Sequence, residues 1–215
     1  IAIAMPRLPP EPSLDWSNPE TPRAASFDDI YFSSRGGLAE SEAVFLAGTG
    51  LPEGGQNRDR FALCELGFGT GLNILAVWRA RKLARKPHAQ LHISSIEAYP
   101  LAKADAARAL AAFPDVADLA ESLLARWPVR AYGPQRLWFP EDGLSLTLHI
   151  GEAEAVLAGM SGAFDAWFLV GFAPARNPGM WSPETLRHVG RLSAPGARLA
   201  TFTVAGDVRR GLSAA

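Results

Sequence analysis

Three glycines at alternate positions follow directly on a short apolar run, and they constrain this chain more than any other feature. The run 61–66 ends just before Gly67, Gly69 and Gly71, and a helical pattern begins after the last glycine. This spacing predicts a strand, a tight turn and a helix start, a geometry in which the backbone can approach a ligand closely. Because strands and helices alternate further along the chain, we expect an α/β fold with a doubly wound, mostly parallel sheet.

Two acids accompany the glycine turn. Glu65 precedes the first glycine by two residues, and Glu97 ends the next apolar run. In a parallel sheet both lie near the carboxyl ends of adjacent strands, where ligands bind. The G-x-G-x-G spacing differs from the G-x-G-x-x-G of dinucleotide-binding proteins. Together these features predict an S-adenosylmethionine pocket, with Glu97 accepting hydrogen bonds from the ribose hydroxyls; a purely structural turn is the alternative explanation of the glycines alone.

The composition favours one folded domain. The chain has 215 residues, of which 48% are hydrophobic, enough for a sizeable core. The single cysteine, Cys64, excludes an internal disulfide and a multi-cysteine zinc site, and its place in a predicted strand indicates a buried, inert thiol. The histidines His88, His92, His149 and His188 show no ligand spacing, so no metal site is expected. No apolar run is long enough to span a membrane and no signal peptide is visible, which predicts a cytoplasmic protein without membrane contact.

The chain divides into an irregular proline-rich arm, residues 1–25, and an α/β domain, residues 26–215. The first core helix is expected over 71–85, with Leu72, Leu75, Ala76 and Leu83 facing the sheet. Residues 135–139 and 144–150 flank a turn and predict a hairpin. The expected core strands are 61–66, 91–96, 144–150, 166–170 and 198–204.

Charge is distributed unevenly along the chain. Residues 1–170 hold 15 Lys and Arg against 20 Asp and Glu, whereas residues 171–215 hold 6 Arg against 2 acids. A basic C-terminal segment with Arg209 and Arg210 could meet the phosphates of a nucleic acid. Solvated surface arginines are the alternative.

Several separated motifs resemble one family. They are residues 27–33, 67–73, 165–169, 171–178, 180–181 and 200–203. These motifs are similar to the methyltransferase domain of the bifunctional tRNA 5-methylaminomethyl-2-thiouridine biosynthesis protein, and the likeness runs from about residue 27 to residue 211.

The resemblance implies a Rossmann-like class I S-adenosylmethionine-dependent methyltransferase fold over residues 26–215. Such a domain transfers a methyl group from S-adenosyl-L-methionine to the aminomethyl nitrogen of a modified wobble uridine, the last step of 5-methylaminomethyl-2-thiouridine formation. The implied partners are the tRNA anticodon stem-loop and an FAD-dependent oxidase, present as a further domain or as a separate protein. The fold normally closes with two strands after the fifth, so a C-terminal truncation is expected here.

One position departs from the family pattern. The family's fourth strand ends in Leu-Asp-Gly-Phe-Ala-Pro, whereas this chain has Val170 in place of the aspartate. A carboxylate there could position the acceptor amine and take its proton, and valine can do neither. The alternatives to a tRNA methyltransferase are therefore an impaired S-adenosylmethionine-binding module that docks tRNA, and a small-molecule amine methyltransferase.

The motifs also imply the site residues. Tyr31 is expected to cover the cofactor or to pack in the core, and Glu152 to contact the adenine or to stabilise a helix N-terminus. Phe172 and Trp181 would stack on a base or support the loop, and Arg176 would meet phosphate or solvent. The expected catalytic residues are Val170, Phe172, Arg176, Asn177 and Trp181. The expected cofactor-binding residues are Tyr31, Glu65, Gly67, Phe68, Gly69, Thr70, Gly71, Asn73, Glu97, Ala98, Gly151, Glu152 and Val170.

Overall fold

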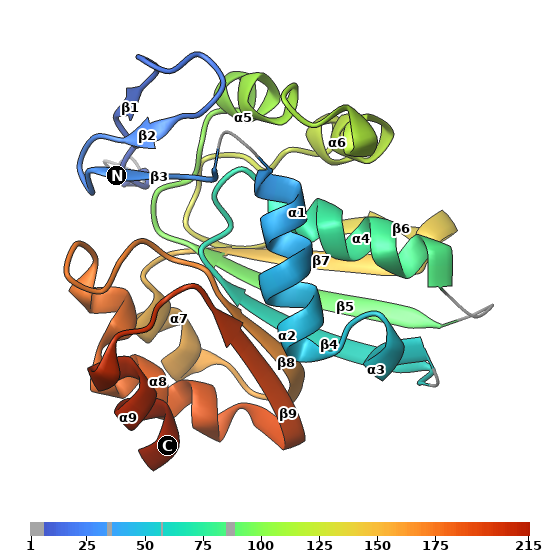
Figure 1. Cartoon of the computed structure of the whole chain (residues 1–215), viewed down its shortest axis with the longest axis vertical. Helices are drawn as coiled ribbons and strands as arrows, with labels where there is room; N and C mark the ends of the chain where they lie inside the picture. The colour runs from blue at the N-terminus through green and yellow to red at the C-terminus, as the bar shows by residue number, and fades with distance from the viewer. Residues whose placement is uncertain (1–6, 34–35, 57, 85–88) are drawn as a thin grey trace, which may run out of the picture.

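Two sheets are present in the computed structural model, which describes residues 7–33, 36–56, 58–84 and 89–215. A small antiparallel sheet near the N-terminus is made of three two-residue strands, β1 (Leu14–Asp15), β2 (Arg23–Ala24) and β3 (Asp29–Ile30). Two of these strands fall inside the arm that the prolines predict to be irregular. They lie over one end of the main sheet (Figure 1).

The main sheet has the strand order β6-β7-β5-β4-β8-β9 over the described residues. Its strands are β4 (Arg60–Leu66), β5 (Gln90–Glu97), β6 (Gly133–Phe139), β7 (Leu144–Ile150), β8 (Phe164–Leu169) and β9 (Ser193–Thr201). Every neighbouring pair is parallel except β6 and β7, which form the predicted hairpin. The expected doubly wound, mostly parallel sheet is confirmed.

The last strand begins earlier than its turn residues suggest. Pro195 and Gly196 lie inside β9, where the pairing with β8 shifts its register between Phe164 and Ala166. Gly196 has φ of +78°, which a glycine adopts without strain. The turn signal in the sequence is therefore an irregularity within an edge strand, and the chain then continues into α9.

Helices cover both faces of the main sheet (Figure 1). One face carries a helical segment at 37–49, α4 and α6, and the other carries α7, α8 and α9. The α-helices are α1 (Gly37–Ser41), α2 (Ala47–Thr49), α3 (Glu53–Gln56), α4 (Leu72–Ala84), α5 (Lys103–Leu110), α6 (Ala117–Ala125), α7 (Ala153–Gly159), α8 (Pro183–Arg191) and α9 (Gly206–Ala214), and a π-helical turn, Glu42–Leu46, joins the first two. None of the helices in the described residues combines the length and apolar character needed to cross a membrane.

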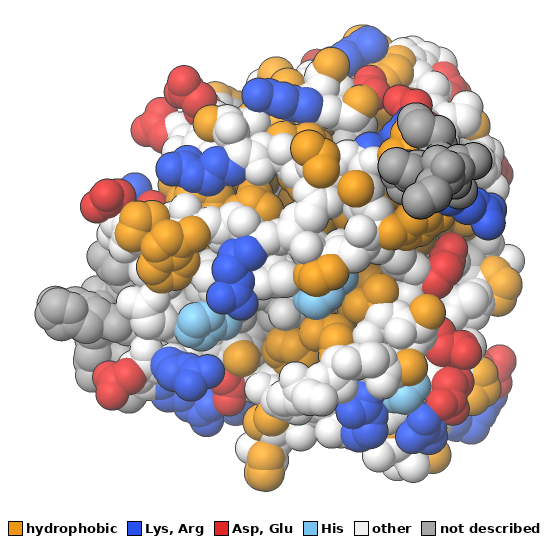
Figure 2. All heavy atoms as spheres, turned by 180° about the vertical axis from the view of Figure 1, so that it is seen from behind, with side chains coloured by type: hydrophobic (Ala, Val, Ile, Leu, Met, Phe, Trp, Pro, Cys, Tyr) orange, Lys and Arg blue, Asp and Glu red, His pale blue; other side chains and the backbone are white. Residues whose placement is uncertain are grey.

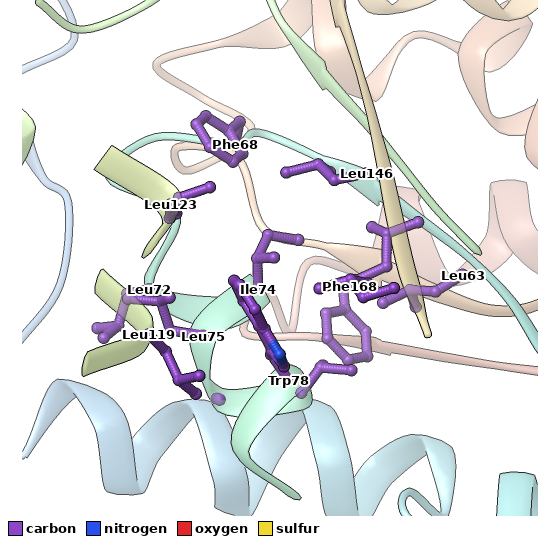
Figure 3. Close-up of a cluster of buried hydrophobic side chains, with 14 of the residues drawn as sticks. Leu63, Phe68, Leu72, Ile74, Leu75, Trp78, Leu119, Leu123, Leu146 and Phe168 are labelled. Carbon is purple, nitrogen blue, oxygen red and sulfur yellow. The ribbon is translucent and has the colours of Figure 1, made fainter. Parts of the chain in front are cut away.

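The larger core lies between α4 and the sheet. Ile74 and Leu75 of α4 pack with Phe168 of β8 and Leu146 of β7, and all four side chains are fully buried (Figure 3). This packing fixes the N-terminus of α4 above the carboxyl ends of the strands. The glycine turn that connects β4 to α4 is therefore held at that edge.

Leu83 does not join this core, although the helix pattern predicts that it faces the sheet. Its side chain is 83% exposed, whereas Leu75 is fully buried. Leu83 lies in the last turn of α4, beyond the residues of the helix that contribute to the core. Arg85, where the helix was expected to end, and His88 lie outside the described residues.

The two leucines of α4 provide a matched test of the core. Leu75→Ala should lower the free energy of unfolding by about 2–5 kcal/mol, because it removes buried methyl groups and leaves a cavity. Leu83→Ala should change it by less than about 0.5 kcal/mol. Urea unfolding followed by circular dichroism measures both, and equal effects of the two substitutions would contradict this packing.

Candidate functional site

The carboxyl ends of β4, β5 and β8 meet at one edge of the sheet. Leu66 is paired with Ile96 on one side and with Leu169 on the other. Beyond Leu66 the backbone N–H of Gly67 donates to the carbonyl of Ile96, at 2.9 Å. The N–H groups of Val170 and Gly171 both donate to the carbonyl of Leu66, at 3.0 and 3.1 Å. The first glycine and the loop after β8 are thus tied to the same strand end.

Gly67 and Gly69 are required by close approach. Gly67 has φ of +97°, and a Cβ there would lie 3.2 Å from the backbone nitrogen of Gly171. Gly69 has φ of +53°, and a Cβ there would lie 3.1 Å from the ring of Tyr31. A side chain at either position would fill the space between the turn and its neighbours, so the turn presents bare backbone toward the cavity.

Glu97 is held by backbone donors at the end of β5. Its Oε2 accepts from the N–H of Gly69 at 2.9 Å, and its Oε1 accepts from the N–H of Tyr99 at 2.8 Å. Burial raises the pKa of the Glu97 carboxyl, and hydrogen bonds from the backbone of Gly69, Tyr99 and Ala98 oppose that shift. The carboxylate therefore has a fixed orientation and keeps lone pairs for hydroxyl donors.

A cavity of about 510 Å³ opens at this edge, a volume typical of small-molecule sites. Most of the predicted site residues line it. They are Tyr31, Gly67, Phe68, Gly69, Thr70, Asn73, Glu97, Ala98, Gly151, Glu152, Val170, Phe172 and Asn177. Its wall is formed by the glycine turn, by the residues that follow β5, β7 and β8, and by the N-terminal segment.

Glu152 and Tyr31 both belong to the cavity wall. Glu152 occupies the position before α7 and makes no side-chain capping hydrogen bond to that helix. Its charge adds to the effect of burial in raising the pKa of Glu97. Tyr31 contacts the glycine turn and the ring of Phe172, with ring centroids 5.4 Å apart.

Four predicted residues do not line the cavity, although all are described. Gly71 is packed against Leu123, from which a Cβ would lie 2.9 Å. Trp181 is 7% exposed, belongs to the core against α7 and α8, and donates from Nε1 to the carbonyl of Phe172 at 2.9 Å. Arg176 forms an ion pair with Asp28 and donates to the carbonyls of Phe27 and Asp28. The fourth residue, Glu65, is described separately below.

Glu65 is fully buried beneath the cavity floor. Its Oε2 accepts from the hydroxyl of Ser95 at 2.6 Å, and its Oε1 accepts from Nδ2 of Asn73 at 3.3 Å. This differs from the expected contact with the cofactor, because β4 is central and covered on both faces. Burial raises the pKa of Glu65 to about 8, against the hydrogen bonds from Ser95 and Asn73 that lower it. A hydrogen bond connects Glu65 to Asn73, which lines the cavity. The Oδ1 of Asn73 in turn accepts from the hydroxyl of Ser41 at 2.6 Å.

Sequence reasoning missed part of the wall. Phe27, Asp29, Glu40, Tyr99 and Phe202 line the cavity without having been assigned to the site. Phe27 and Asp29 lie in a motif that supports the family resemblance, so the motif itself was the available signal.

Figure 2 shows the side of the molecule that faces away from the viewer in Figure 1, and positive and negative side chains are interspersed on it. No group of three or more histidine, cysteine, aspartate and glutamate side chains in the described part of the chain is arranged to hold a metal ion.

Comparison with known proteins agrees with this geometry. A family model described as S-adenosyl-L-methionine-dependent methyltransferase matches residues 114–215. The tRNA 5-methylaminomethyl-2-thiouridine biosynthesis bifunctional protein MnmC of Maricaulis maris is 52% identical over 202 residues, which are 94% of this chain and 34% of that protein. The corresponding protein of Caulobacter sp. strain K31 is 50% identical over 207 residues, again 94% of this chain and 34% of that protein. The chain is an S-adenosyl-L-methionine-dependent methyltransferase domain.

The chain spans about a third of the length of these curated relatives, and it matches the methyltransferase part of them. The crystal structure of MnmC2 from Aquifex aeolicus has a TM-score of 0.74 and 20% identity, and covers 90% of this chain and 59% of that chain. At this identity the likeness shows the fold. The expected fold class and the expected methyl donor, S-adenosyl-L-methionine, are confirmed.

The buried acid predicts an unusual dependence of stability on pH. Because the pKa of Glu65 is raised to about 8 in the folded chain, the folded state holds a proton that the unfolded state releases above its ordinary pKa of about 4.3. This contribution to stability is complete below about pH 4 and is lost as the pH rises to about 8, at up to about 1.4 kcal/mol per pH unit.

Urea unfolding at pH 5.5 and 7.5 measures this effect. Glu65→Gln should lose less stability than the parent chain between the two pH values, by about 1–3 kcal/mol. Glu20→Gln, in an exposed part of the N-terminal segment, is the matched control and should keep the parent's pH dependence. An unchanged pH dependence in Glu65→Gln would mean that Glu65 is ionised in the folded state.

Proposed function

We propose that this domain transfers a methyl group to the aminomethyl nitrogen of a modified wobble uridine in tRNA. The observation that carries the proposal is 52% identity, over 94% of the chain, to a protein named for tRNA 5-methylaminomethyl-2-thiouridine biosynthesis. The cavity at the carboxyl ends of β4, β5 and β8 supports it, since that is where an α/β sheet binds its ligands. The same cavity holds two chemically different halves.

The first half fits the methyl donor. Glu97 has a fixed carboxylate that can accept hydrogen bonds from the two ribose hydroxyls. Gly67 and Gly69 leave bare backbone where side chains would block the space. Glu152 lines the cavity after β7, and in this proposal it accepts a hydrogen bond from the amino group of adenine. When bound, S-adenosyl-L-methionine supplies an electrophilic methyl group on a positively charged sulfur.

The second half suits a planar acceptor. It consists of the loop after β8 and the N-terminal segment, which meet at the ring contact between Phe27 and Phe172, with centroids 4.8 Å apart. Phe172 and Asn177 line this half, and a base taken out of its stack can lie against an aromatic ring. Arg176 and Trp181 do not line the cavity. They act here as positioning residues, since their contacts stabilise the loop that carries Phe172.

Methyl transfer to an amine needs a free lone pair on nitrogen. An alkylammonium must give one proton away before the nitrogen attacks the methyl carbon, and the carbon–sulfur bond then breaks with its electron pair on sulfur. Val170 lines the cavity at the end of β8 and offers no group to take that proton. The side chain at position 170 therefore cannot act as the base in this chain, and the expected rate is low.

The remaining partners follow from the relatives. We infer that the anticodon stem-loop of tRNA is bound at the cavity mouth and that Arg209 and Arg210 on α9 meet its phosphates, Arg210 being paired with Asp207 in the free chain. An FAD-dependent oxidase, as a further domain or a separate protein, would supply the aminomethyl group. Such a role places the domain in the cytoplasm of a bacterial cell, where tRNA is modified.

Removing the carboxylate at the end of β5 tests the donor site. Glu97→Ala should weaken S-adenosyl-L-methionine binding by tenfold or more, because two charge-assisted hydrogen bonds are worth about 1.5–3 kcal/mol each. Isothermal titration calorimetry measures the affinity. Glu121→Ala, on the exposed surface of α6, is the control and should bind like the parent chain. Unchanged affinity in Glu97→Ala would rule out the ribose contact.

Transfer of a labelled methyl group to tRNA that carries 5-aminomethyl-2-thiouridine tests the function itself. Val170→Asp should increase this transfer by about 10²–10⁴-fold, the usual contribution of a general base, while donor affinity changes much less. Transfer to free amines but not to tRNA would instead identify a small-molecule methyltransferase. Donor binding without transfer in either chain would identify a binding module.

A further inference from the structure

Two consecutive aspartates hold the loop after β8 at both of its ends. Asp28 pairs with Arg23 of β2 and with Arg176 near the end of the loop. Asp29 accepts a hydrogen bond at Oδ2 from the N–H of Ala173, at 3.1 Å, near the start of the loop. Asp29 and Ala173 are 144 positions apart in the sequence, and Asp28 and Arg176 are 148 positions apart. The N-terminal segment and the loop therefore form one wall.

The backbone at Asp28 makes this double contact possible. Asp28 has φ of +50°, a left-handed conformation that aspartate adopts more readily than most residues. The turn directs Asp28 to the two arginines, whose hydrogen bonds lower the pKa of its carboxyl. Asp29 is directed to the loop backbone and to the cavity. The two adjacent carboxylates thus have different tasks.

The Asp29 carboxylate is fixed and still able to bind a ligand. Its Oδ1 accepts from the N–H of Ile30 at 2.9 Å, and its Oδ2 accepts from Ala173. A carboxylate has about four acceptor positions, so these two bonds leave others for a donor in the cavity that Asp29 lines. Both partners are backbone N–H groups, so the orientation of the carboxylate is set by the main chain.

Three aromatic side chains line the same cavity as this carboxylate. Phe27 and Phe172 are stacked with centroids 4.8 Å apart, and Tyr31 meets Phe172 edge-on at 5.4 Å. A carboxylate beside aromatic rings is the chemistry that recognises an alkylammonium group, through a charge-assisted hydrogen bond and through attraction of the cation to the ring.

The other carboxylates of the cavity are placed differently. Glu97 is bound to the glycine turn, and Glu152 follows β7 on the donor side. Glu40 is exposed on α1, the helix that precedes the first strand of the main sheet. Of these four described acids, Asp29 is the one attached to the loop that carries Phe172.

We propose that Asp29 is the anionic contact for the cationic amine of the methyl acceptor, with the planar ring of the acceptor held against Phe172. This inference rests on the proposed function and adds the group that selects an amine. An ion pair also favours the protonated amine, so Asp29 contributes to recognition of the acceptor rather than to the rate of methyl transfer. Its role is therefore separate from that of position 170.

The test compares two nucleosides that differ by one charged group. 5-Aminomethyluridine and 5-methyluridine are titrated by NMR into the chain saturated with S-adenosylhomocysteine, which cannot donate a methyl group. The parent chain should bind the amine at least tenfold more tightly than the neutral nucleoside, and Asp29→Asn should abolish this preference. A parent chain that binds neither nucleoside, or shows no preference, overturns the proposal, as does a preference that persists in Asp29→Asn.

Three further variants separate recognition from structure. Asp28→Asn weakens the contacts of the same wall but keeps the Asp29 carboxylate. It should therefore weaken the binding of both nucleosides to the same extent and keep the preference for the amine. Glu20→Gln removes one exposed charge from the N-terminal segment and should change neither affinity. Loss of the preference in Glu40→Gln together with its retention in Asp29→Asn would assign the contact to Glu40 and overturn the proposal.

Folding of each variant is checked by its affinity for S-adenosylhomocysteine. If Asp29→Asn fails that check, Asp29→Ser replaces it, since it also removes the carboxylate and is smaller than the parent side chain. The outcome is also distinguishable from failure of the proposed function. Preference for the amine without methyl transfer to tRNA contradicts the function alone, whereas transfer to tRNA without any amine preference contradicts this inference alone.

Discussion

The close approach of two backbones at the end of β4 is the constraint on which the site depends. The carbonyl of Leu66 accepts from the N–H groups of both Val170 and Gly171. Gly67 lies so near that a Cβ on it would be 3.2 Å from the backbone nitrogen of Gly171. The turn that presents bare backbone and the loop that bears Phe172 therefore share one origin. Their relative placement is set by strand hydrogen bonds rather than by side chains that could move.

The donor half was predictable because its signals are local. A strand pattern followed by spaced glycines locates the turn, and an acid at the end of the next strand locates Glu97. Parallel neighbours in a sheet end at the same edge, so these two signals combine without knowledge of the rest of the fold. The contact between Gly69 and Glu97 spans only 28 residues in the sequence.

The acceptor half was predicted incompletely because its contacts are remote. Nothing around Arg176 indicates that its partner is Asp28, and an arginine in a loop predicts a phosphate contact equally well. Glu65 has the residue type of a ligand-binding acid, but its burial depends on both faces of the sheet being covered. Leu83 obeys the helical periodicity, yet the periodicity does not say where the core ends along α4. Each of these outcomes depends on tertiary packing.

The order in which the two halves form follows from the same distances along the chain. Contacts between the N-terminal segment and the loop close a stretch of 144 to 149 residues, and such closures carry the largest entropic cost during folding. The donor half is complete once β4, α4, β5 and β7 have packed. The acceptor wall is therefore expected to assemble last and to be released first on partial unfolding, so that the chain passes through a state able to hold the donor before it can select an acceptor.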